Sequence, residues 1–376
     1  MASIGIDYTA AYEQGGGIGR YVRELVTALA QLDTTTEYRL FVSGVKAQKP
    51  LPPLPGANFT WRGTAITPLW LARLWQRAQI PLNVETFTGR VDLYHATDFT
   101  LPPTRFKTRT LLTVHDLSFV RVPEAASPAL KAYLDAVVPR SVRRADHVLA
   151  DSQATKDDLI ALYNTPAEKI TVLLSGVDAR FKRTETPAIR AKYQIPERQY
   201  ILSVGTVQPR KNYIRLITAL AALRASGHDV GLVIVGGKGW LEDPIYEAIR
   251  STGMTDYVHM TGFADDADLP ALYSQALITA LPSLYEGFGI PVLESMACGT
   301  PVLTSNVSSL PEVAGDAAIM VAPSDQDAIT EALERMITDA DLRADLARRG
   351  LERAQMFTWA AAARQLAGVY AEMLKG

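Results

Sequence analysis

The stretch Leu281–Thr304, which reads LPSLYEGFGIPVLESMACGTPVLT, constrains the fold of this chain more than any other. An apolar run beginning at Ala276 enters it and stops at a Pro-Ser pair, as buried parallel strands do when they reach a loop. Pro291 suits the first turn of a helix, and Gly299 suits its end. A second apolar run closes the stretch. The pattern therefore predicts a strand, a glycine-containing loop, a short helix and another strand.

The same alternation of strand-like and helix-like segments recurs through both halves of the chain, which predicts two parallel-sheet α/β domains. With 376 residues the chain is long enough for two domains, each with its own core. A cleft between two such domains is the usual place for a ligand.

Two glutamates in the stretch Leu281–Thr304 lie eight residues apart, Glu286 in the predicted loop and Glu294 in the predicted helix. Free N–H groups at a helix start and nearby glycines suit an anionic or polyhydroxylated ligand. A carboxylate can accept hydrogen bonds from two neighbouring hydroxyls, as a ribose or a sugar ring offers. The residues alone are equally compatible with a structural unit that has one solvated and one loop-anchoring glutamate.

A glycine-rich turn, Gly15–Arg20, follows the first predicted strand, Ser3–Asp7, and a loop at Tyr8–Gln14. Apolar residues at helical spacing come next, so the turn opens a helix whose start favours phosphate or another anion. A G-x-G-x-x-G register does not fit it, because Arg20 and Val22 stand where glycines are needed. This argues against a dinucleotide-binding oxidoreductase. A tight structural turn is the alternative.

Two adjacent cations, Arg210 and Lys211, follow the predicted strand Tyr200–Gly205 and precede a helix. Such a turn suits a diphosphate. Fixed cations stabilise a departing nucleotide more in the transition state than in the ground state, because negative charge accumulates there. A solvated basic turn is the alternative.

His115 lies immediately beyond the predicted strand Thr110–Val114, where α/β folds bind ligands. Imidazole can donate to a sugar hydroxyl or move a proton near neutral pH. The residues alone also allow a structural histidine. Asp116 is predicted either to orient the ring or to cap the next turn.

Charge and cysteine content exclude several classes of function. A net charge of −2 argues against a general nucleic-acid binder, and the single cysteine, Cys298, excludes an internal disulfide framework and a thiol metal cluster. Asp266 and Asp268 spell a D-x-D metal motif, but we expect Asp265–Asp268 to cap a helix. No His, Cys and carboxylate residues cluster at ligand spacing, so neither a metal nor a cofactor is expected.

The chain shows no signal-peptide pattern and no long uncharged apolar run, which predicts a cytoplasmic protein. The segment Trp61–Arg77 mixes tryptophan, leucine and arginine without an acidic residue. It is interpreted either as a helix packed on its domain or as a peripheral contact with the inner face of the membrane.

The frame PS-x-x-EGFG-x-P-x-LE-x-MACG-x-PV resembles the E-x7-E segment of the retaining GT-B glycosyltransferases of family 4. The resemblance covers nearly the whole chain apart from residues of about 45–90. It implies two Rossmann-like domains that face a cleft, residues 1–182 on the acceptor side and residues 183–356 on the nucleotide-sugar side. Residues 357–376 would form a helix that crosses back onto the first domain.

The resemblance also implies a role for each matching residue. Glu286 and His115 would hold the donor sugar, Glu294 the ribose, and Arg210 and Lys211 the phosphates, which makes all but Glu294 catalytic candidates. Arg20 would contact the acceptor. Further donor contacts would come from the glycine turns, the loop near the base and the helix start, namely Gly16, Gly17, Gly205, Phe263, Phe288, Gly289 and Ile290.

The strings HDLSF at His115 and PRKN at Arg210 are similar to those of mannosyltransferase-like members. This resemblance implies a hexosyltransferase that moves mannose from GDP-mannose to a hydroxyl of a glycan or a lipid-linked saccharide, without a metal. The chain departs from the family pattern at Thr206, where an arginine is usual. A UDP-sugar-dependent transferase, a GT-B sugar-nucleotide epimerase and a catalytically inactive nucleotide-sugar binder remain alternatives. The hypothetical mechanism is front-face attack with the leaving phosphate as base and no covalent nucleophile.

Overall fold

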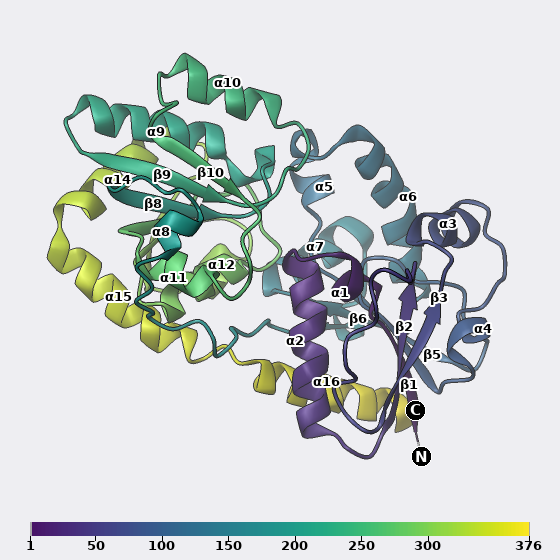
Figure 1. Cartoon of the computed structure of the whole chain (residues 1–376). Helices are drawn as coiled ribbons and strands as arrows, with labels where there is room; N and C mark the ends of the chain where they lie inside the picture. The colour runs from purple at the N-terminus through teal and green to yellow at the C-terminus, as the bar shows by residue number, and fades with distance from the viewer. Residues whose placement is uncertain (1, 376) are drawn as a thin grey trace. The chain divides into compact units, whose positions relative to one another are not determined.

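The structure is a computed structural model that describes residues 2–375 of the chain (Figure 1). These residues form two compact units, each described separately below. Unit 1 contains residues 2–117, 132–176 and 358–375, and unit 2 contains residues 118–131 and 177–357. The predicted pair of parallel-sheet α/β domains is confirmed.

Unit 1 has a seven-stranded sheet in the order β3-β2-β1-β4-β5-β6-β7, with parallel pairing throughout. Its strands are β1 (Ser3–Asp7), β2 (Glu37–Ser43), β3 (Phe59–Thr64), β4 (Leu93–Ala96), β5 (Arg109–Val114), β6 (His147–Ala150) and β7 (Ile170–Val172). Its helices are α1 (Thr9–Glu13), α2 (Gly17–Leu32), α3 (Pro68–Ala72), the π-helical turn Arg73–Arg77, α4 (Glu85–Thr88), α6 (Pro128–Arg144), α7 (Gln153–Tyr163), a 3-10 turn at Ala167–Lys169 and α16 (Trp359–Lys375).

The C-terminal helix α16 packs on α2, as expected for this class of fold. Trp359 at its start lies against the Tyr21 ring, with centroids 5.9 Å apart. Farther along, Tyr370 Oη lies 2.8 Å from His95 Nδ1 on β4, and His95 Nε2 lies 2.8 Å from Thr113 Oγ1 on β5. Burial and the charge of His115 lower the pKa of His95 to about 3, so this ring is neutral and ties α16 to the sheet.

Unit 2 has a six-stranded parallel sheet in the order β10-β9-β8-β11-β12-β13. Its strands are β8 (Gln199–Val204), β9 (Val230–Val235), β10 (Val258–Gly262), β11 (Ile278–Leu281), β12 (Val302–Ser305) and β13 (Ala318–Val321). Its helices are α5 (Ser118–Arg121), α8 (Ile189–Lys192), α9 (Tyr213–Ala225), α10 (Asp243–Ser251), α11 (Leu269–Ser274), α12 (Ile290–Ala297), α13 (Leu310–Ala314), α14 (Gln326–Thr338) and α15 (Ala340–Ala354), with 3-10 turns at Pro123–Ala125 and Pro209–Lys211.

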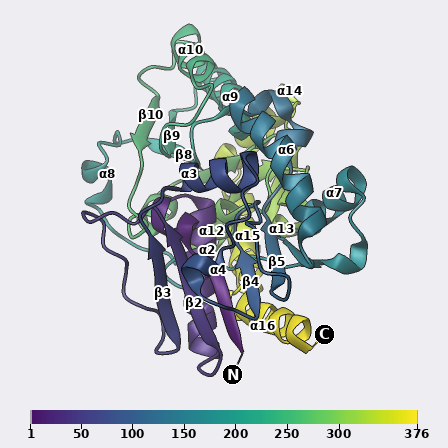
Figure 2. The same cartoon turned by 90° about the vertical axis from the view of Figure 1, so that its right-hand side faces the viewer.

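Both sheets bury their central strands on two faces, because helices flank each sheet (Figure 2). All six residues of β9 are buried, in keeping with its unbroken VGLVIV sequence. The apolar faces of α9 and α14 pack on this sheet in one large cluster. The strands of unit 2 therefore hold their carboxyl-end loops on a rigid base.

Several sequence predictions were wrong in detail. Residues predicted as a loop after β1 include the five-residue helix α1. Asp268 is the N-cap residue of α11, but its side chain makes no capping bond. Instead, Asp268 Oδ2 accepts from Lys192 Nζ at 2.5 Å and from Tyr193 Oη at 2.6 Å. An ion pair to α8 has replaced the expected cap.

The basic aromatic segment Trp61–Arg77 is not one helix. Its first four residues lie on β3, and after a short bend the chain forms α3 and then the π-helical turn. Trp75 is buried, while Leu69 and Trp70 are 61% and 55% exposed. None of the helices in the described part of the chain is both long and apolar enough to span a bilayer.

Candidate functional site

The strand order of unit 2 changes direction at β8, which pairs with β9 on one side and with β11 on the other. Ligands of open α/β sheets bind outside the carboxyl ends of the strands at such a switch point. The loop after β8 carries Arg210 and Lys211, and the loop after β11 carries Glu286. The topology therefore brings the three residues to one edge of the sheet.

The carboxylate of Glu286 is the centre of a compact ion cluster. Its Oε2 accepts from Arg210 Nη1 at 2.6 Å, and its Oε1 accepts from Lys211 Nζ at 2.6 Å. Ser283 Oγ also donates to Oε1 at 2.6 Å. The sequence predicted each charged residue separately, and the structure joins them into one group.

The cluster contains two cations and one anion, so it keeps a net positive charge in a largely dry setting. The side chains of Lys211 and Glu286 are each 8% exposed, and that of Arg210 is 17% exposed. Burial alone would raise the pKa of Glu286, but the charges of Arg210 and Lys211 outweigh burial and lower it from 4.5 to about 2. The site therefore favours an anionic group and keeps Glu286 ionised near neutral pH.

Serines that the sequence analysis did not single out hold the loop around Glu286. Ser308 Oγ accepts from the Glu286 N–H at 3.0 Å. Ser309 Oγ lies 2.9 Å from the carbonyl oxygen of Glu286 and 2.8 Å from that of Phe288, sharing its proton between them. Arg210 Nη1 also donates to the carbonyl oxygen of Tyr285 at 2.7 Å. These bonds make the loop rigid before any ligand arrives.

Glycines allow the loops at this edge to approach each other closely. A Cβ on Gly205 would lie 2.7 Å from Lys211 Cε, on the path by which that side chain reaches Glu286. A Cβ on Gly236 would lie only 2.0 Å from the carbonyl oxygen of Gly205. The glycine turn after β9 therefore packs backbone to backbone on the loop after β8.

Glu294 is 1% exposed, and its Oε2 accepts from Tyr273 Oη at 2.9 Å. Its predicted contact with ribose stays a prediction. At the start of α12, Gly289 has φ +114°, and a Cβ there would lie 2.9 Å from Leu310 Cδ2. Phe288 is buried against Phe357, and Ile290 is partly buried. Phe263, at the end of β10, is 61% exposed.

In unit 1, His115 is 5% exposed, and both its ring nitrogens are engaged. Nδ1 lies 2.7 Å from Asp151 Oδ2, and Nε2 lies 2.9 Å from the carbonyl oxygen of Thr97. Asp151 therefore holds Nδ1 of the ring, whereas one of the two alternatives from the sequence gave the orienting role to Asp116. The sequence offers Asp151 or Ser152 as the cap of α7, and Ser152 takes this role, because its Oγ accepts from the Thr155 N–H at 3.1 Å.

The glycine turn of unit 1 leads directly into α2. Gly16 is its N-cap, no side chain caps the helix, and its first turn has no acidic residue. A Cβ on Gly16 or Gly17 would meet no atom within 4 Å, whereas one on Gly19 would lie 2.3 Å from the carbonyl oxygen of Gln14. Packing therefore requires Gly19, which the sequence analysis did not single out. Arg20 lies on the first turn and is partly exposed.

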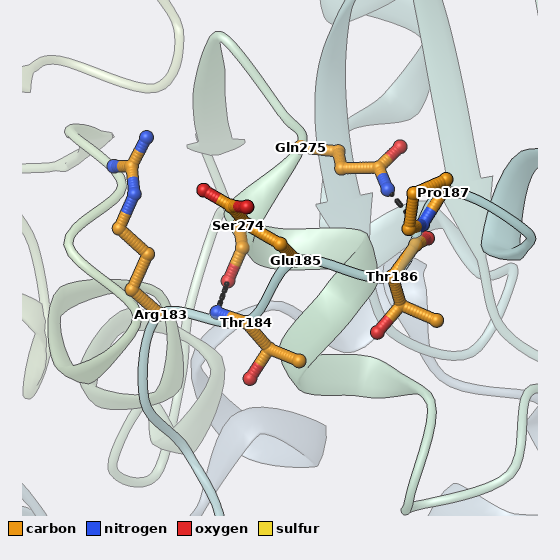
Figure 3. A pocket seen from close by; sticks show the side chains of 7 residues that line it. All are labelled: Arg183, Thr184, Glu185, Thr186, Pro187, Ser274 and Gln275. Carbon is orange, nitrogen blue, oxygen red and sulfur yellow. Dashed lines mark hydrogen bonds between the residues drawn. The ribbon is translucent and has the colours of Figure 1, made fainter.

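A hollow of about 340 Å³ lies elsewhere in unit 2 (Figure 3). Two of its walls are joined by hydrogen bonds, from the Thr184 N–H to Ser274 Oγ at 3.0 Å and from Gln275 Nε2 to the carbonyl oxygen of Thr186 at 2.8 Å. None of the predicted site residues lines this hollow. The Glu286 cluster lies at the switch point of the sheet and is therefore the better candidate site. The lining residues are Arg183, Thr184, Glu185, Thr186, Pro187, Ser274 and Gln275. Within residues 2–375, no three His, Cys, Asp or Glu residues are grouped so that they could hold a metal ion.

Comparison with known proteins bears directly on this arrangement. Residues 15–181 match the family described as Glycosyltransferase Family 4, and residues 185–353 match Glycosyl transferases group 1. The O-antigen chain mannosyltransferase B of Escherichia coli is 30% identical over 371 residues, covering 94% of this chain and 95% of the relative. The chain belongs to the group 1, family 4 glycosyltransferases.

Solved structures agree with this family 4 fold. Sucrose-phosphate synthase from Thermosynechococcus elongatus superposes with a TM-score of 0.79 at 22% identity, covering 100% of both chains. Anabaena HepE, solved with UDP and glucose, has a TM-score of 0.75 at 19% identity, covering 99% of this chain and 100% of that one. The GT-B prediction made for this glycosyltransferase is confirmed.

Proposed function

We propose that this family 4 glycosyltransferase is a retaining enzyme that moves a hexose from a nucleotide diphosphate sugar to an acceptor hydroxyl. The observation that carries the proposal is the ion cluster of Arg210, Lys211 and Glu286 in unit 2. Its net positive charge and burial suit a diphosphate that gains negative charge as it leaves. Glu286, held by three donors, orients the two cations and stands beside the sugar.

In the proposed reaction, the acceptor oxygen forms a bond to C1 of the hexose on the face from which the diphosphate departs. The bond between C1 and the phosphate oxygen breaks, and its electron pair stays with the diphosphate. The proton of the acceptor hydroxyl passes to the departing phosphate oxygen. Arg210 and Lys211 stabilise the charge on that oxygen, and His115 contributes a contact to the sugar.

GDP-mannose is the donor that we favour. The HDLSF and PRKN strings support it, as does the similarity to a mannosyltransferase of Escherichia coli at 30% identity. A UDP-sugar is the second candidate, because HepE was solved with UDP and glucose. We assign Glu294 to the ribose, Phe263 to the base, and Gly16, Gly17, Gly205, Phe288, Gly289 and Ile290 to the rest of the donor.

A thermal-shift panel distinguishes these donors. The full chain is heated with GDP, UDP, ADP and their common sugar conjugates, without added metal and with a chelator in a parallel set. A ligand that binds only the folded state raises Tm, by more as its concentration exceeds Kd. We expect GDP and GDP-mannose to raise Tm by several degrees and the other nucleotides to have little effect. A selective response to UDP compounds would overturn the donor, and no response to any nucleotide would overturn the whole proposal.

The acceptor is proposed to be a glycan or a lipid-linked saccharide, with Arg20 as a contact. The surface of α3 supports a peripheral contact with an anionic membrane face. Leu69 and Trp70 are exposed there, and the Arg73 guanidinium lies 4.9 Å from the centre of a Trp70 ring. Exposed apolar side chains beside arginines are typical of segments that bind lipid headgroups.

Sedimentation with lipid vesicles tests this contact. The Leu69→Ala and Trp70→Ala double variant should bind vesicles that contain an anionic lipid at least about fivefold more weakly. It lacks apolar surface whose removal from water contributes about 25 cal/mol per Å² to the binding free energy. Leu32→Ala, which removes a 46% exposed leucine at the end of α2, serves as the matched control. Equal binding by the double variant and the control would contradict the contact.

A further inference from the structure

The two hydrogen bonds of the His115 ring define where its protons lie. The Nε2 atom lies 2.9 Å from the backbone carbonyl oxygen of Thr97, which has no proton to give, so Nε2 carries a hydrogen. A second proton lies between Nδ1 and Asp151 Oδ2, which are 2.7 Å apart. Imidazole is a stronger base than a carboxylate, with an ordinary pKa of about 6.5 against about 3.9. The ordinary order of basicity therefore assigns this proton to His115.

The charges around the ring support the same assignment. Burial would lower the pKa of His115, but the carboxylates of Asp151 beyond β6 and Asp98 in the β4–β5 loop raise it to about 9. Burial also raises the pKa of Asp151, but the imidazole begins as the stronger base. His95 on β4 is neutral, and Tyr21 on α2 has a pKa well above 10.0. Asp116, next in the chain, adds a further carboxylate.

The ring is also enclosed by aromatic side chains. Tyr21 and Phe99 meet it edge to face, with ring centroids 5.1 Å and 5.4 Å away. Phe99 has φ +52°, a left-handed conformation that is unusual for a bulky residue and that strains the backbone. The β4–β5 loop that carries this strain also supplies the Thr97 carbonyl. Separate elements thus hold one imidazole in one orientation.

We propose that Asp151 is a positioning residue that holds His115 as a doubly protonated imidazolium, so that His115 is a fixed positive group and not the acceptor of the hydroxyl proton. The statement that His115 does not accept the hydroxyl proton rests on the proposed function. An imidazolium has no lone pair with which to take a proton. The proton of the attacking hydroxyl therefore goes to the departing phosphate oxygen, and His115 keeps its own protons through the reaction.

Nitrogen-15 NMR of the histidine rings in the full chain tests the charge without any substrate. The His115 signal is identified by its loss in His115→Gln. We expect both ring nitrogens of His115 to be protonated at pH 7 and to remain so up to a pH of about 9. A neutral ring with an unprotonated Nδ1 at pH 7 would overturn the proposal.

Asp151→Asn removes the charge and keeps the size of the partner. We expect the pKa of His115 in this variant to fall below its ordinary 6.5, because burial is then opposed only by the smaller effects of the Asp98 carboxylate and the Thr97 carbonyl. Asp116→Asn is the matched control, since it removes the neighbouring carboxylate but leaves the bond to Asp151, and His115 should stay protonated at pH 7. A protonated His115 in Asp151→Asn at pH 8 would contradict the role of Asp151.

The rate of GDP release from GDP-mannose tests the consequence for the reaction. A general base with a pKa of about 9 would make the rate rise about tenfold per pH unit between pH 6 and 9, and we expect no such rise. Asp151→Asn should lose at least about tenfold at pH 8 and recover part of this at pH 6, where His115 regains its proton. A tenfold rise in rate per pH unit in the wild type would overturn the proposal that His115 is not a base. Parallel pH–rate profiles for the wild type and Asp151→Asn would overturn the positioning role of Asp151. If His115 is doubly protonated but the chain turns over no nucleotide sugar, the proposed function is wrong, whereas the ion pair of His115 and Asp151 is still supported.

Discussion

Lys211→Met is expected to reduce turnover by about 10²–10³-fold, because it removes a fixed cation from the place where the departing diphosphate gathers charge. Lys211 Nζ lies 2.6 Å from Glu286 Oε1, and the Lys211 side chain is only 8% exposed. Water can therefore compensate only poorly for the loss of this positive charge. Methionine keeps most of the length and the apolar stem. The measurement is the rate of GDP release from GDP-mannose, together with Kd for GDP, which should rise about tenfold or more.

The variant should remain folded, because Glu286 still accepts from Arg210 and Ser283 after the substitution. Lys192→Met is the matched control. It also removes a lysine paired with carboxylates, Asp265 and Asp268, but its side chain is 51% exposed on α8. Surface pairs contribute little, so the control should keep its turnover. Turnover of Lys211→Met within threefold of the wild type would remove the diphosphate role from Lys211.

Most of the fold could be predicted, because buried parallel strands carry a strong local signal. Continuous apolar runs such as β9 are visible without any knowledge of their neighbours. Strand β3 was missed, because its sequence FTWRGT has only two large apolar residues, Phe59 and Trp61, and because it lies at the edge of the sheet. Helix α1 was missed because five residues are too few for a helical period to appear.

The site was predictable as a set of residues but not as a set of contacts. Arg210 and Lys211 are 76 and 75 residues from Glu286, so nothing local indicates that their side chains meet. The pair of His115 and Asp151 spans 36 residues and joins the ends of neighbouring strands. The sequence does not distinguish this carboxylate from a helix cap, because Asp151 and the adjacent Ser152 are both good capping residues. Strand order alone decides which residues become neighbours.

Glu286→Gln is expected to destabilise unit 2 as well as to abolish turnover. The substitution leaves the charges of Arg210 and Lys211 beside each other without the carboxylate between them. Losing one partner of a buried ion group typically costs about 3–5 kcal/mol. We expect the free energy of unfolding of the full chain in urea at pH 7, followed by circular dichroism, to fall by about 3 kcal/mol. Glu247→Gln, which breaks the exposed pair with Arg250, is the matched control and should cost less than about 0.5 kcal/mol.

The pH dependence of this loss identifies its electrostatic origin. The pKa of Glu286 is lowered from 4.5 to about 2 in the folded chain, so its ionisation stabilises the fold fully above about pH 4.5. That stabilisation declines as the pH falls below 4.5 and is lost on passing through about 2, because the carboxylate then takes up a proton in both states. The difference in unfolding free energy between wild type and Glu286→Gln should therefore be constant from pH 7 to about 5 and shrink towards zero near pH 2. A difference that stayed constant down to pH 2.5 would mean that the variant acts by lost packing and not by lost charge.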